Sequence, residues 1–370
     1  MKKKLMTAAV AAALAVPTLA FAAVDVYGLL DIGIQNVKPG SGYAGAKTFI
    51  NDAQGSGGTR LGFRGTDDIG GGLKGVFVYE LGTRPDTGAL DNASTSTPTT
   101  TPAPTVANHT HTDTAVQLFQ RQIYGGLTGG FGSATLGRQY TEEFLVAASG
   151  DYNVAAALIS PYGLENKTTR ASNSFKYSSP PLGPVVLAAT FGLGDEGTTA
   201  ATADNNKYFD VSAKAALGAV KVGLAVSKTT VTTTPEAENK DTTLGGNWNF
   251  GMGTLYFVYT TDKTTTAGAT TGDQTLMSLG AAFKLGGGDL VVQWARVDDK
   301  TAGNNDAQLT ALAYYYSLSK ATTVYASYGK LNNNVTGTRS MTGQAAFSGP
   351  AGSAPGDDPS ALVAGWKIAF

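Results

Sequence analysis

Histidine and cysteine, the residue types that most often supply catalysis or bind transition metals, are almost absent from this sequence. The 370 residues contain no cysteine, which excludes disulfides, thiolate zinc sites and cysteine nucleophiles. The two histidines, His109 and His111, fall in a Thr- and Pro-rich stretch at residues 94–114, where a base fixed as in a Ser-His-Asp triad is not expected. Two ligands in such a stretch also make a poor metal site. We therefore expect no enzymatic activity, no cofactor and no metal.

Arginine is the remaining residue type that could act on other molecules. Arg60 and Arg64 alternate with Leu61 and Phe63, so a strand would place both arginines on the face opposite the apolar residues. Arg170 begins a similar alternating segment, residues 170–177. Arginine stays charged at any relevant pH, so several arginines on one wet face would act on dissolved ions. The sequence therefore predicts an electrostatic site.

The elements that position these arginines are predicted to be β-strands. A period of two separates apolar from polar residues on a strand, whereas a helix would scatter both sets around its circumference. In residues 208–217, one face carries Phe209, Val211, Ala213, Ala215 and Leu217, and the other carries Tyr208, Asp210, Ser212 and Lys214. The 16 predicted strands cover residues 24–35, 59–67, 73–82, 118–127, 133–140, 170–177, 185–192, 207–216, 220–228, 242–250, 254–261, 274–284, 289–298, 308–318, 322–331 and 361–370.

The connections between the predicted strands alternate between short and long, and the long ones include 36–58, 83–117, 141–169, 193–206 and 332–360. This alternation is typical of membrane barrels, which have short periplasmic turns on one rim and long extracellular loops on the other. Strands in a bilayer must close on themselves, because every backbone group needs an internal partner. An exported β-sandwich or surface adhesin is the alternative, but it has no reason to keep the alternation. We therefore predict an all-β fold, a 16-stranded antiparallel transmembrane β-barrel.

The N-terminus has the form of a cleaved export signal. A basic segment at residues 2–4 precedes an apolar run at residues 5–19, and Ala20-Phe21-Ala22 fits a cleavage site. We expect a signal peptide at residues 1–22 and a mature barrel at residues 23–370. The signal holds three lysines and no acidic residue, so the mature chain has 24 basic and 28 acidic residues. This charge gives no basic footprint for nucleic acid.

Short motifs along the whole mature chain resemble those of Gram-negative general-diffusion porins of the beta-proteobacterial branch. Each motif alone is weak, but their order along a chain of this length is specific. They are Val26-Tyr27-Gly28, Thr59-Arg60-Leu61-Gly62-Phe63-Arg64-Gly65, Asp68-Ile69-Gly70-Gly71-Gly72-Leu73-Lys74, Arg121-Gln122 ahead of Tyr124-Gly125-Gly126-Leu127, Thr135-Leu136-Gly137-Arg138-Gln139-Tyr140, Arg170 ahead of Asn173-Ser174-Phe175-Lys176-Tyr177, and a terminal Phe370.

The resemblance implies a homotrimer of barrels in the lipid of the bacterial outer membrane, through which small hydrophilic solutes and ions diffuse passively. It implies that the third extracellular loop, residues 141–169, folds into the lumen as a constriction. It also implies that Phe370 serves as a signal for assembly into the outer membrane.

The resemblance assigns residues to the constriction as well. Positions matching Arg60, Arg138 and Arg170 line its basic wall, Arg121 matches a further lumen-facing position, and Arg64 joins them by strand alternation. Leu29 occupies a position that is basic in some relatives. The opposing acidic wall is expected from the loop carboxylates Glu142, Glu143, Asp151 and Glu165. The apolar part of that loop, residues 154–159, is expected to lie against Ala134 and Leu136.

Carboxylates that face arginines across a narrow aqueous gap create a transverse field that favours polar solutes. Because basic residues outnumber acidic ones at the predicted lumen positions, we expect a mild preference for anions. The alternative is a substrate-specific channel for small anionic or sugar solutes, in which the run Tyr314, Tyr315 and Tyr316 could supply aromatic contacts.

Overall fold

The computed structural model describes residues 23–38, 46–52, 58–90, 118–152, 160–164, 167–194, 206–231, 235–339 and 355–370. Four sequence predictions lie outside these residues: the signal peptide 1–22, the Thr- and Pro-rich stretch with His109 and His111, the apolar segment 154–159, and Glu165. In the described part of the chain, no helix is both long enough and apolar enough to cross a membrane.

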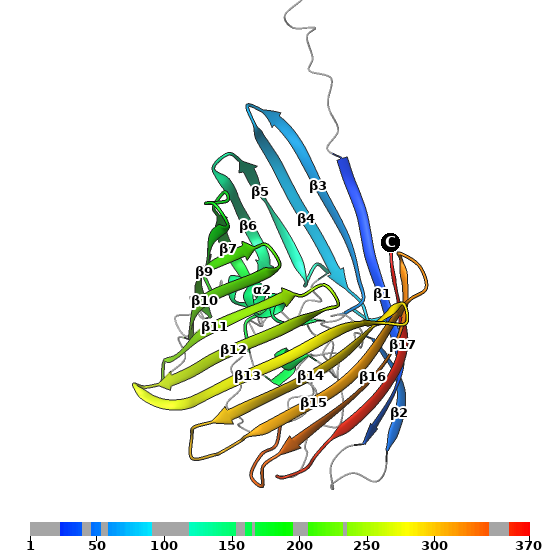
Figure 1. Ribbon diagram of the computed structural model, residues 1–370. Coiled ribbons are helices and arrows are strands. Elements are labelled where there is room, and N and C mark those ends of the chain that lie inside the picture. The colour runs from blue at the N-terminus through cyan, green and yellow to red at the C-terminus, as the bar shows by residue number, and fades with distance from the viewer. Residues whose placement is uncertain are drawn as a thin grey trace, which may run out of the picture.

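The described residues form seventeen strands and two short helices (Figure 1). The strands are β1 (Ala23–Lys38), β2 (Lys47–Asp52), β3 (Arg60–Gly70), β4 (Leu73–Gly82), β5 (Gln122–Gly129), β6 (Gly132–Tyr140), β7 (Arg170–Ser178), β8 (Val185–Gly192), β9 (Lys207–Leu217), β10 (Val220–Val231), β11 (Ala237–Asn249), β12 (Gly253–Thr266), β13 (Ala269–Leu285), β14 (Gly288–Asp299), β15 (Ala307–Ser317), β16 (Thr322–Asn333) and β17 (Ser360–Ala369). The helices are α2 (Glu142–Ser149) and the 3₁₀ helix η1 (Pro161–Leu164).

The strands close into an antiparallel barrel because β17 pairs with β1. Backbone bonds between Gly28 and Phe370, at 2.8 and 3.1 Å, join the last residue of the chain to the first strand. β2 and β3 share one position in the barrel, since β3 pairs with residues 23–29 of β1 and β2 pairs with residues 32–37. The barrel is therefore 16-stranded, which confirms the predicted fold. The prediction missed β2, a six-residue strand inside the expected loop 36–58.

The two faces of the wall have opposite chemistry. On β9 and β10, the outer side chains of Phe209, Val211 and Leu224 are exposed, whereas the inner side chains of Asp210 and Ser227 are buried. Because a bilayer solvates apolar side chains and leaves the polar ones to the interior, this arrangement suits a membrane-spanning barrel.

One rim carries the short turns and the other carries the long connections. The β3–β4 turn consists of Gly71 and Gly72, both with positive φ, which other residues rarely adopt. Both chain ends that the structure describes, Ala23 and Phe370, lie on this short-turn rim, because β1 starts there and β17 ends there. The opposite rim carries the connections from β4 to β5, β6 to β7 and β16 to β17.

The loop between β6 and β7 lies inside the barrel. α2 contacts β8, β9, β10 and β11, and η1 contacts β14. Figure 1 shows α2 enclosed by the strands. Leu164 packs with inward-facing residues of β13 to β17, among them Leu276 and Leu331. The loop therefore covers part of the inner wall, and its position defines the candidate site.

Candidate functional site

Two arginines share the carboxylate of Glu80 on the inner wall. The Nε of Arg121 donates to Glu80 Oε1 at 2.7 Å, and the Nε of Arg60 lies 3.9 Å from Glu80 Oε2. The hydroxyl of Tyr27 donates to the same Oε2 at 3.0 Å. Glu80 and Arg121 are both buried. One negative charge therefore faces two positive charges at this point of the wall.

Tyr140 connects a third arginine to this pair. Its hydroxyl accepts hydrogen bonds from Nη2 of Arg121 at 2.9 Å and from Nη2 of Arg170 at 3.1 Å. The guanidinium of Arg170 also lies over the Tyr140 ring, 4.7 Å from its centroid, a favourable cation–π geometry. We call Arg60, Arg121, Arg170, Glu80 and Tyr140 the arginine cluster. Three guanidinium groups and one carboxylate give the cluster a net charge of +2.

The residues beside the cluster extend the charged wall onto β1 and β17. Leu29 pairs with Arg60 in the β1–β3 register and is buried, so it lies next to the cluster. Asp31 and Lys367 pair across β1 and β17, and the hydroxyl of Tyr325 donates to Asp31 Oδ1 at 2.7 Å. Leu29, Asp31 and Lys367 therefore line the lumen wall beside the arginine cluster.

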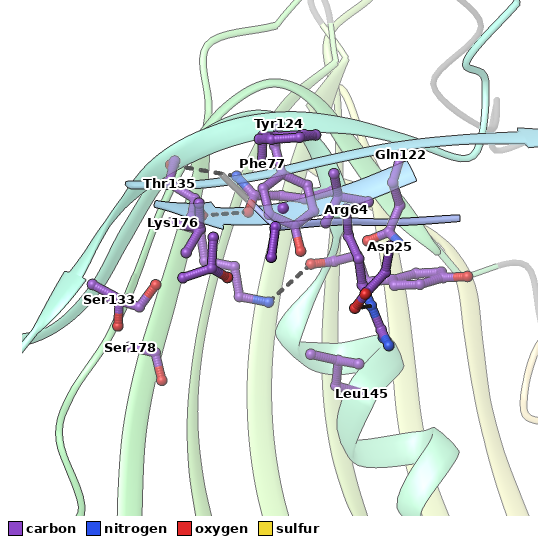
Figure 2. Close-up of a pocket in the computed structure, with 18 residues that line it drawn as sticks. Asp25, Arg64, Phe77, Gln122, Tyr124, Ser133, Thr135, Leu145, Lys176 and Ser178 are labelled. Atoms are coloured by element: carbon purple, nitrogen blue, oxygen red, sulfur yellow. Dashed lines mark hydrogen bonds and ion pairs between the residues drawn. The ribbon is translucent and has the colours of Figure 1, made fainter. Parts of the chain in front are cut away.

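Arg64 lies apart from the cluster. Its Nε is 3.4 Å from Asp25 Oδ2, and both side chains are more than half exposed. The two residues line a cavity of about 600 Å³ together with Tyr124 and Lys176 (Figure 2). An exposed ion pair of this kind contributes little to stability, roughly 0–1 kcal/mol. Arg64 is therefore a charge in a wider part of the lumen.

Arg138 is not a member of the arginine cluster. It pairs with Ile123 in the β5–β6 register and shares strand parity with Leu136, and both of these apolar residues are exposed on the outer face. Its guanidinium donates to the backbone oxygen of Gln120 and to Ser172 Oγ, both at 2.6 Å. Among the described residues, no hydrogen bond joins Arg138 to the arginine cluster.

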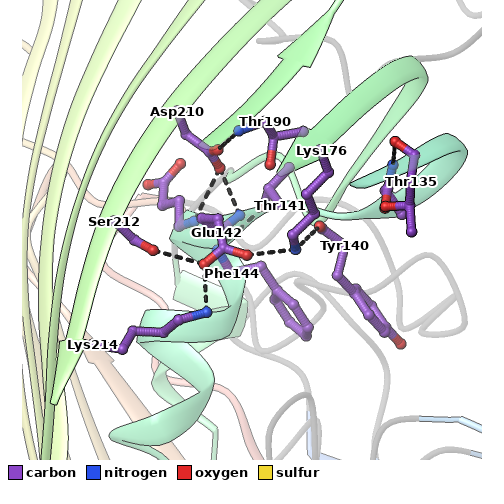
Figure 3. Close-up of polar contacts among 12 residues, drawn as sticks. Thr135, Tyr140, Thr141, Glu142, Phe144, Lys176, Thr190, Asp210, Ser212 and Lys214 are labelled. Carbon is purple, nitrogen blue, oxygen red and sulfur yellow. Dashed lines mark hydrogen bonds and ion pairs between the residues drawn. The ribbon is translucent and has the colours of Figure 1, made fainter. Parts of the chain in front are cut away.

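A buried carboxylate on β9 fixes the start of α2. Asp210 Oδ2 accepts the backbone N–H groups of Glu142 at 2.6 Å and Glu143 at 3.2 Å (Figure 3). The Oγ1 of Thr141 accepts the N–H of Phe144 at 3.2 Å as a helix N-cap. A negative charge at a helix N-terminus also interacts favourably with the helix dipole. Asp210 therefore holds α2 to the inner wall through its backbone.

Glu142 and Glu143 hold the same helix through their side chains. Glu142 forms ion pairs with Lys176 and Lys214, each at 2.5 Å, and Glu143 forms an ion pair with Lys167 at 2.8 Å. Both carboxylates are only 1% exposed. Burial raises the pKa of the Glu142 carboxyl, but Lys176 and Lys214 outweigh it and hold that pKa below its ordinary value. These two residues thus anchor the loop, which differs from the predicted water-facing acidic wall.

Asp151 is also buried, and it accepts a hydrogen bond from Ser160 Oγ within the same loop. Leu136, against which the apolar part of the loop was expected to lie, is 64% exposed on the outer face. At Tyr152 the loop reaches the opposite wall, where the hydroxyl of Tyr152 donates to Asp289 Oδ2 at 2.8 Å.

Glycines on the wall let α2 approach closely. A Cβ added to Gly245 of β11 would lie 2.4 Å from the backbone oxygen of Val146, and one added to Gly223 of β10 would lie 3.0 Å from its Cγ2. A Cβ on Gly150 would lie 2.0 Å from the backbone oxygen of Phe257. The close packing of α2 against the wall therefore depends on the absence of side chains at these positions.

The tyrosine run 314–316 places one ring inside the barrel. Tyr315 is buried on the inner wall, stacked on Tyr325. Tyr316 is exposed on the outer face, and Tyr314 donates its hydroxyl to the backbone oxygen of Leu285 at 2.8 Å. The run therefore supplies no row of aromatic contacts along the lumen. Among the described residues, no group of three or more His, Cys, Asp or Glu could hold a metal ion.

Sequence reasoning missed Tyr140, Lys167 and Asp210 as site residues. Alternation indicated the inward side for Asp210, but its contact with a helix start depends on a loop 67 residues earlier in the chain. No local pattern marks Lys167, whose partners Glu143 and Asp241 come from other segments. Tyr140 belongs to a recognised motif, but only the folded structure shows that its hydroxyl joins two arginines.

Substituting Glu142 with Gln should loosen the loop, because Lys176 and Lys214 then lose their shared carboxylate. Breaking a buried ion pair costs about 3 kcal/mol, and the partial exposure of Lys214 reduces this figure. We expect faster protease cleavage within residues 150–166 and more current noise in single-channel recordings. Glu238→Gln is the control, because Glu238 also pairs with two lysines but is less buried, with 28% of its side chain exposed. Equal cleavage rates in the two variants would contradict the anchoring role.

The comparison with known proteins is consistent across sequence and structure. A family model described as Gram-negative porin matches residues 7–336. Outer membrane porin protein 32 of Delftia acidovorans is 29% identical over 386 residues, which cover 100% of both chains. An outer membrane porin protein of Bordetella pertussis is 26% identical over 90% of this chain and 95% of its own.

Solved structures have the same fold. An anion-selective porin from Comamonas acidovorans matches with a TM-score of 0.80 and 25% identity, over 95% of this chain and 100% of its own. An outer membrane protein of Vibrio cholerae, OmpT in its trimer form, matches with a TM-score of 0.66 and 16% identity, over 94% of this chain and 99% of its own. This second likeness concerns the fold alone.

Proposed function

This chain belongs to the Gram-negative porin family and forms a channel in the bacterial outer membrane, and from that premise we propose that its arginine cluster gives the channel a mild preference for anions. The observation that carries the proposal is the gathering of Arg60, Arg121 and Arg170 around a single carboxylate, Glu80. Fixed charges at a narrow aqueous passage act on passing ions through the local field, whatever the net charge of the protein. The similar porin described as anion-selective supports the same sign.

Small hydrophilic solutes then cross by passive diffusion, without a tight binding step. Arg121 is fixed by Glu80, so Arg60 and Arg170 supply the unbalanced charge of the cluster. Arg64 adds a further positive charge along the cavity on the short-turn side, where Asp25 lies 3.4 Å from it. The loop carboxylates Glu142 and Glu143 form ion pairs with lysines of the loop and wall, so they reduce the positive field at the arginine cluster only a little.

We further propose that the barrels form a homotrimer through the outer face of β1 and β3 to β6. Val24, Val26 and Leu136 expose large apolar side chains there. Arg138 shares the parity of this face, and a charged side chain facing lipid is costly. A neighbouring subunit at this face would spare Arg138 from contact with lipid. The trimer form of a solved outer membrane protein with the same fold supports this arrangement.

The remaining proposals concern export and assembly. We propose that residues 1–22 are a signal peptide removed on export, and that residues 23–370 form the mature barrel. Phe370 is proposed as the assembly signal. Its backbone pairing with Gly28 supports this role, because the last residue completes the closure of the barrel.

The double variant Arg60→Gln/Arg170→Gln should abolish most of the anion preference. It leaves the Arg121–Glu80 pair in place, so the net charge of the cluster falls from +2 to zero while the buried carboxylate keeps its partner. Reversal potentials in a salt gradient measure the effect, and the permeability ratio of chloride to potassium should approach one. Arg64→Gln, which removes a lumen charge outside the cluster, should keep most of the preference. Clear cation preference in the unmodified protein would refute the proposal.

Leu29→Arg should strengthen the anion preference, because the new guanidinium would lie beside Arg60 on the lumen wall. The larger side chain should also lower the single-channel conductance. Leu29→Met separates the two effects, since it changes shape without adding charge. If the arginine variant showed the same ion selectivity as the methionine variant, position 29 would have no part in the field.

Leu136→Asn should weaken the trimer, because it places a polar group in the proposed subunit contact. Electrophoresis in mild detergent should show a trimer for the unmodified protein and more monomer for this variant. Leu244→Asn is matched in chemistry and lies on the outer face of β11, away from the proposed contact, so its trimer should persist. A monomer as the only species of the unmodified protein would count against the trimer.

A further inference from the structure

Three lysines lie side by side on the outer face of the barrel. Lys228 of β10 pairs directly with Lys240 of β11, and Lys240 pairs directly with Lys263 of β12. The inner neighbours Ser227 and Asp262 are buried, so strand parity points the lysines outward. The side chains of Lys228 and Lys240 are 42% and 61% exposed. We call Lys228, Lys240 and Lys263 the lysine row.

The lysine row is unfavourable on its own, because like charges directly opposite each other on a sheet are destabilising. Nearby acids offset it only in part. Glu238 pairs with both Lys228 and Lys240, while Asp273, opposite Lys263, has its carboxylate 3.9 Å from Lys300. Among the described residues, the wider patch holds four lysines, Lys228, Lys240, Lys263 and Lys300, and three carboxylates, Glu236, Glu238 and Asp273. The patch therefore keeps a positive charge that an external anion could balance.

The height of the row on the barrel indicates what that anion is. Toward the short-turn rim, the row is followed by Thr242, Thr261 and Thr275, which pair across β11, β12 and β13. The next row on the same face consists of Leu244, Tyr259 and Met277, all exposed and largely apolar. The lysines thus stand just beyond the apolar belt, on the rim that carries the long loops. In the outer membrane this rim faces the outside of the cell, at the level of the lipid headgroups.

We propose that the lysine row binds the phosphate groups of a phosphorylated lipid in the outer leaflet of the outer membrane. Adjacent strands are about 4.8 Å apart, so three ammonium groups span roughly 10 Å, a distance over which they can hold more than one phosphate. The flexible stems of lysine allow the charges to reach headgroups while the chains of the same lipid lie on Leu244, Tyr259 and Met277. A free phosphate could use the lysines but would leave this apolar surface without a ligand.

The experiment uses the full-length folded barrel in nonionic detergent and native mass spectrometry. The probes are lipid A with both phosphates and the same lipid after its phosphates are removed. The unmodified protein should bind the phosphorylated form more tightly. The triple variant Lys228→Gln/Lys240→Gln/Lys263→Gln should bind it at least about tenfold more weakly. Lys320→Gln, which removes an exposed lysine from a turn on the opposite rim, should bind it like the unmodified protein.

Each other outcome overturns the proposal. Equal binding of the two lipid forms would show that the phosphates are not recognised, and full binding by the triple variant would place recognition elsewhere. Displacement of the lipid by excess inorganic phosphate alone would indicate a phosphate site and no lipid site. Heat-dependent mobility on gels verifies that the triple variant is folded, and the single variant Lys240→Gln, with an expected loss of about fivefold, provides the test if it is not. Unchanged single-channel conductance in these variants separates the lipid site from the lumen.

Discussion

The pairing of every backbone group within the barrel is the constraint on which the rest of the structure depends. A bilayer offers no partner to an unpaired N–H or C=O group, so the sheet must close, and it does so where β17 meets β1. Closure gives each strand one side that faces the lipid and one side that faces the enclosed lumen. The arginine cluster, the buried lysines and the loop all occupy the enclosed side, because that is where charge can be solvated or paired.

The position of the constriction loop depends on buried ion pairs instead of on apolar packing alone. Glu142, Glu143 and Asp210 bring three carboxylates together at the start of α2, and each has partners on the surrounding segments. Burying such charges costs desolvation energy, so the network is weak evidence for added stability. The network instead fixes the position of α2, since the helix cannot shift along the wall without leaving buried charges unpaired.

The strands could be predicted from sequence because alternation is a local property, and all 16 barrel positions follow from it. β2 was missed because six residues give a short pattern. The same alternation predicts an inward face for Arg60, whose Nε lies 3.9 Å from Glu80 Oε2. The lumen position of Arg138 rested on the family resemblance, whereas alternation placed Arg138 on the same face as Leu136, and Gly137 and Asn173 adopt positive φ beside it where the β6–β7 register shifts. The burial of Glu142 could not be predicted, because its partners Lys176 and Lys214 belong to distant strands whose registers no local pattern fixes.

Gly223 and Gly245, which have no side chains, help to set the diameter of the channel. Because α2 rests directly on backbone there, the bore is as wide as this loop allows. A side chain added at Gly223 or Gly245 would push α2 toward the axis of the barrel. Because neither glycine carries a charge, a larger neutral residue at either position would narrow the passage without changing the charges of the wall.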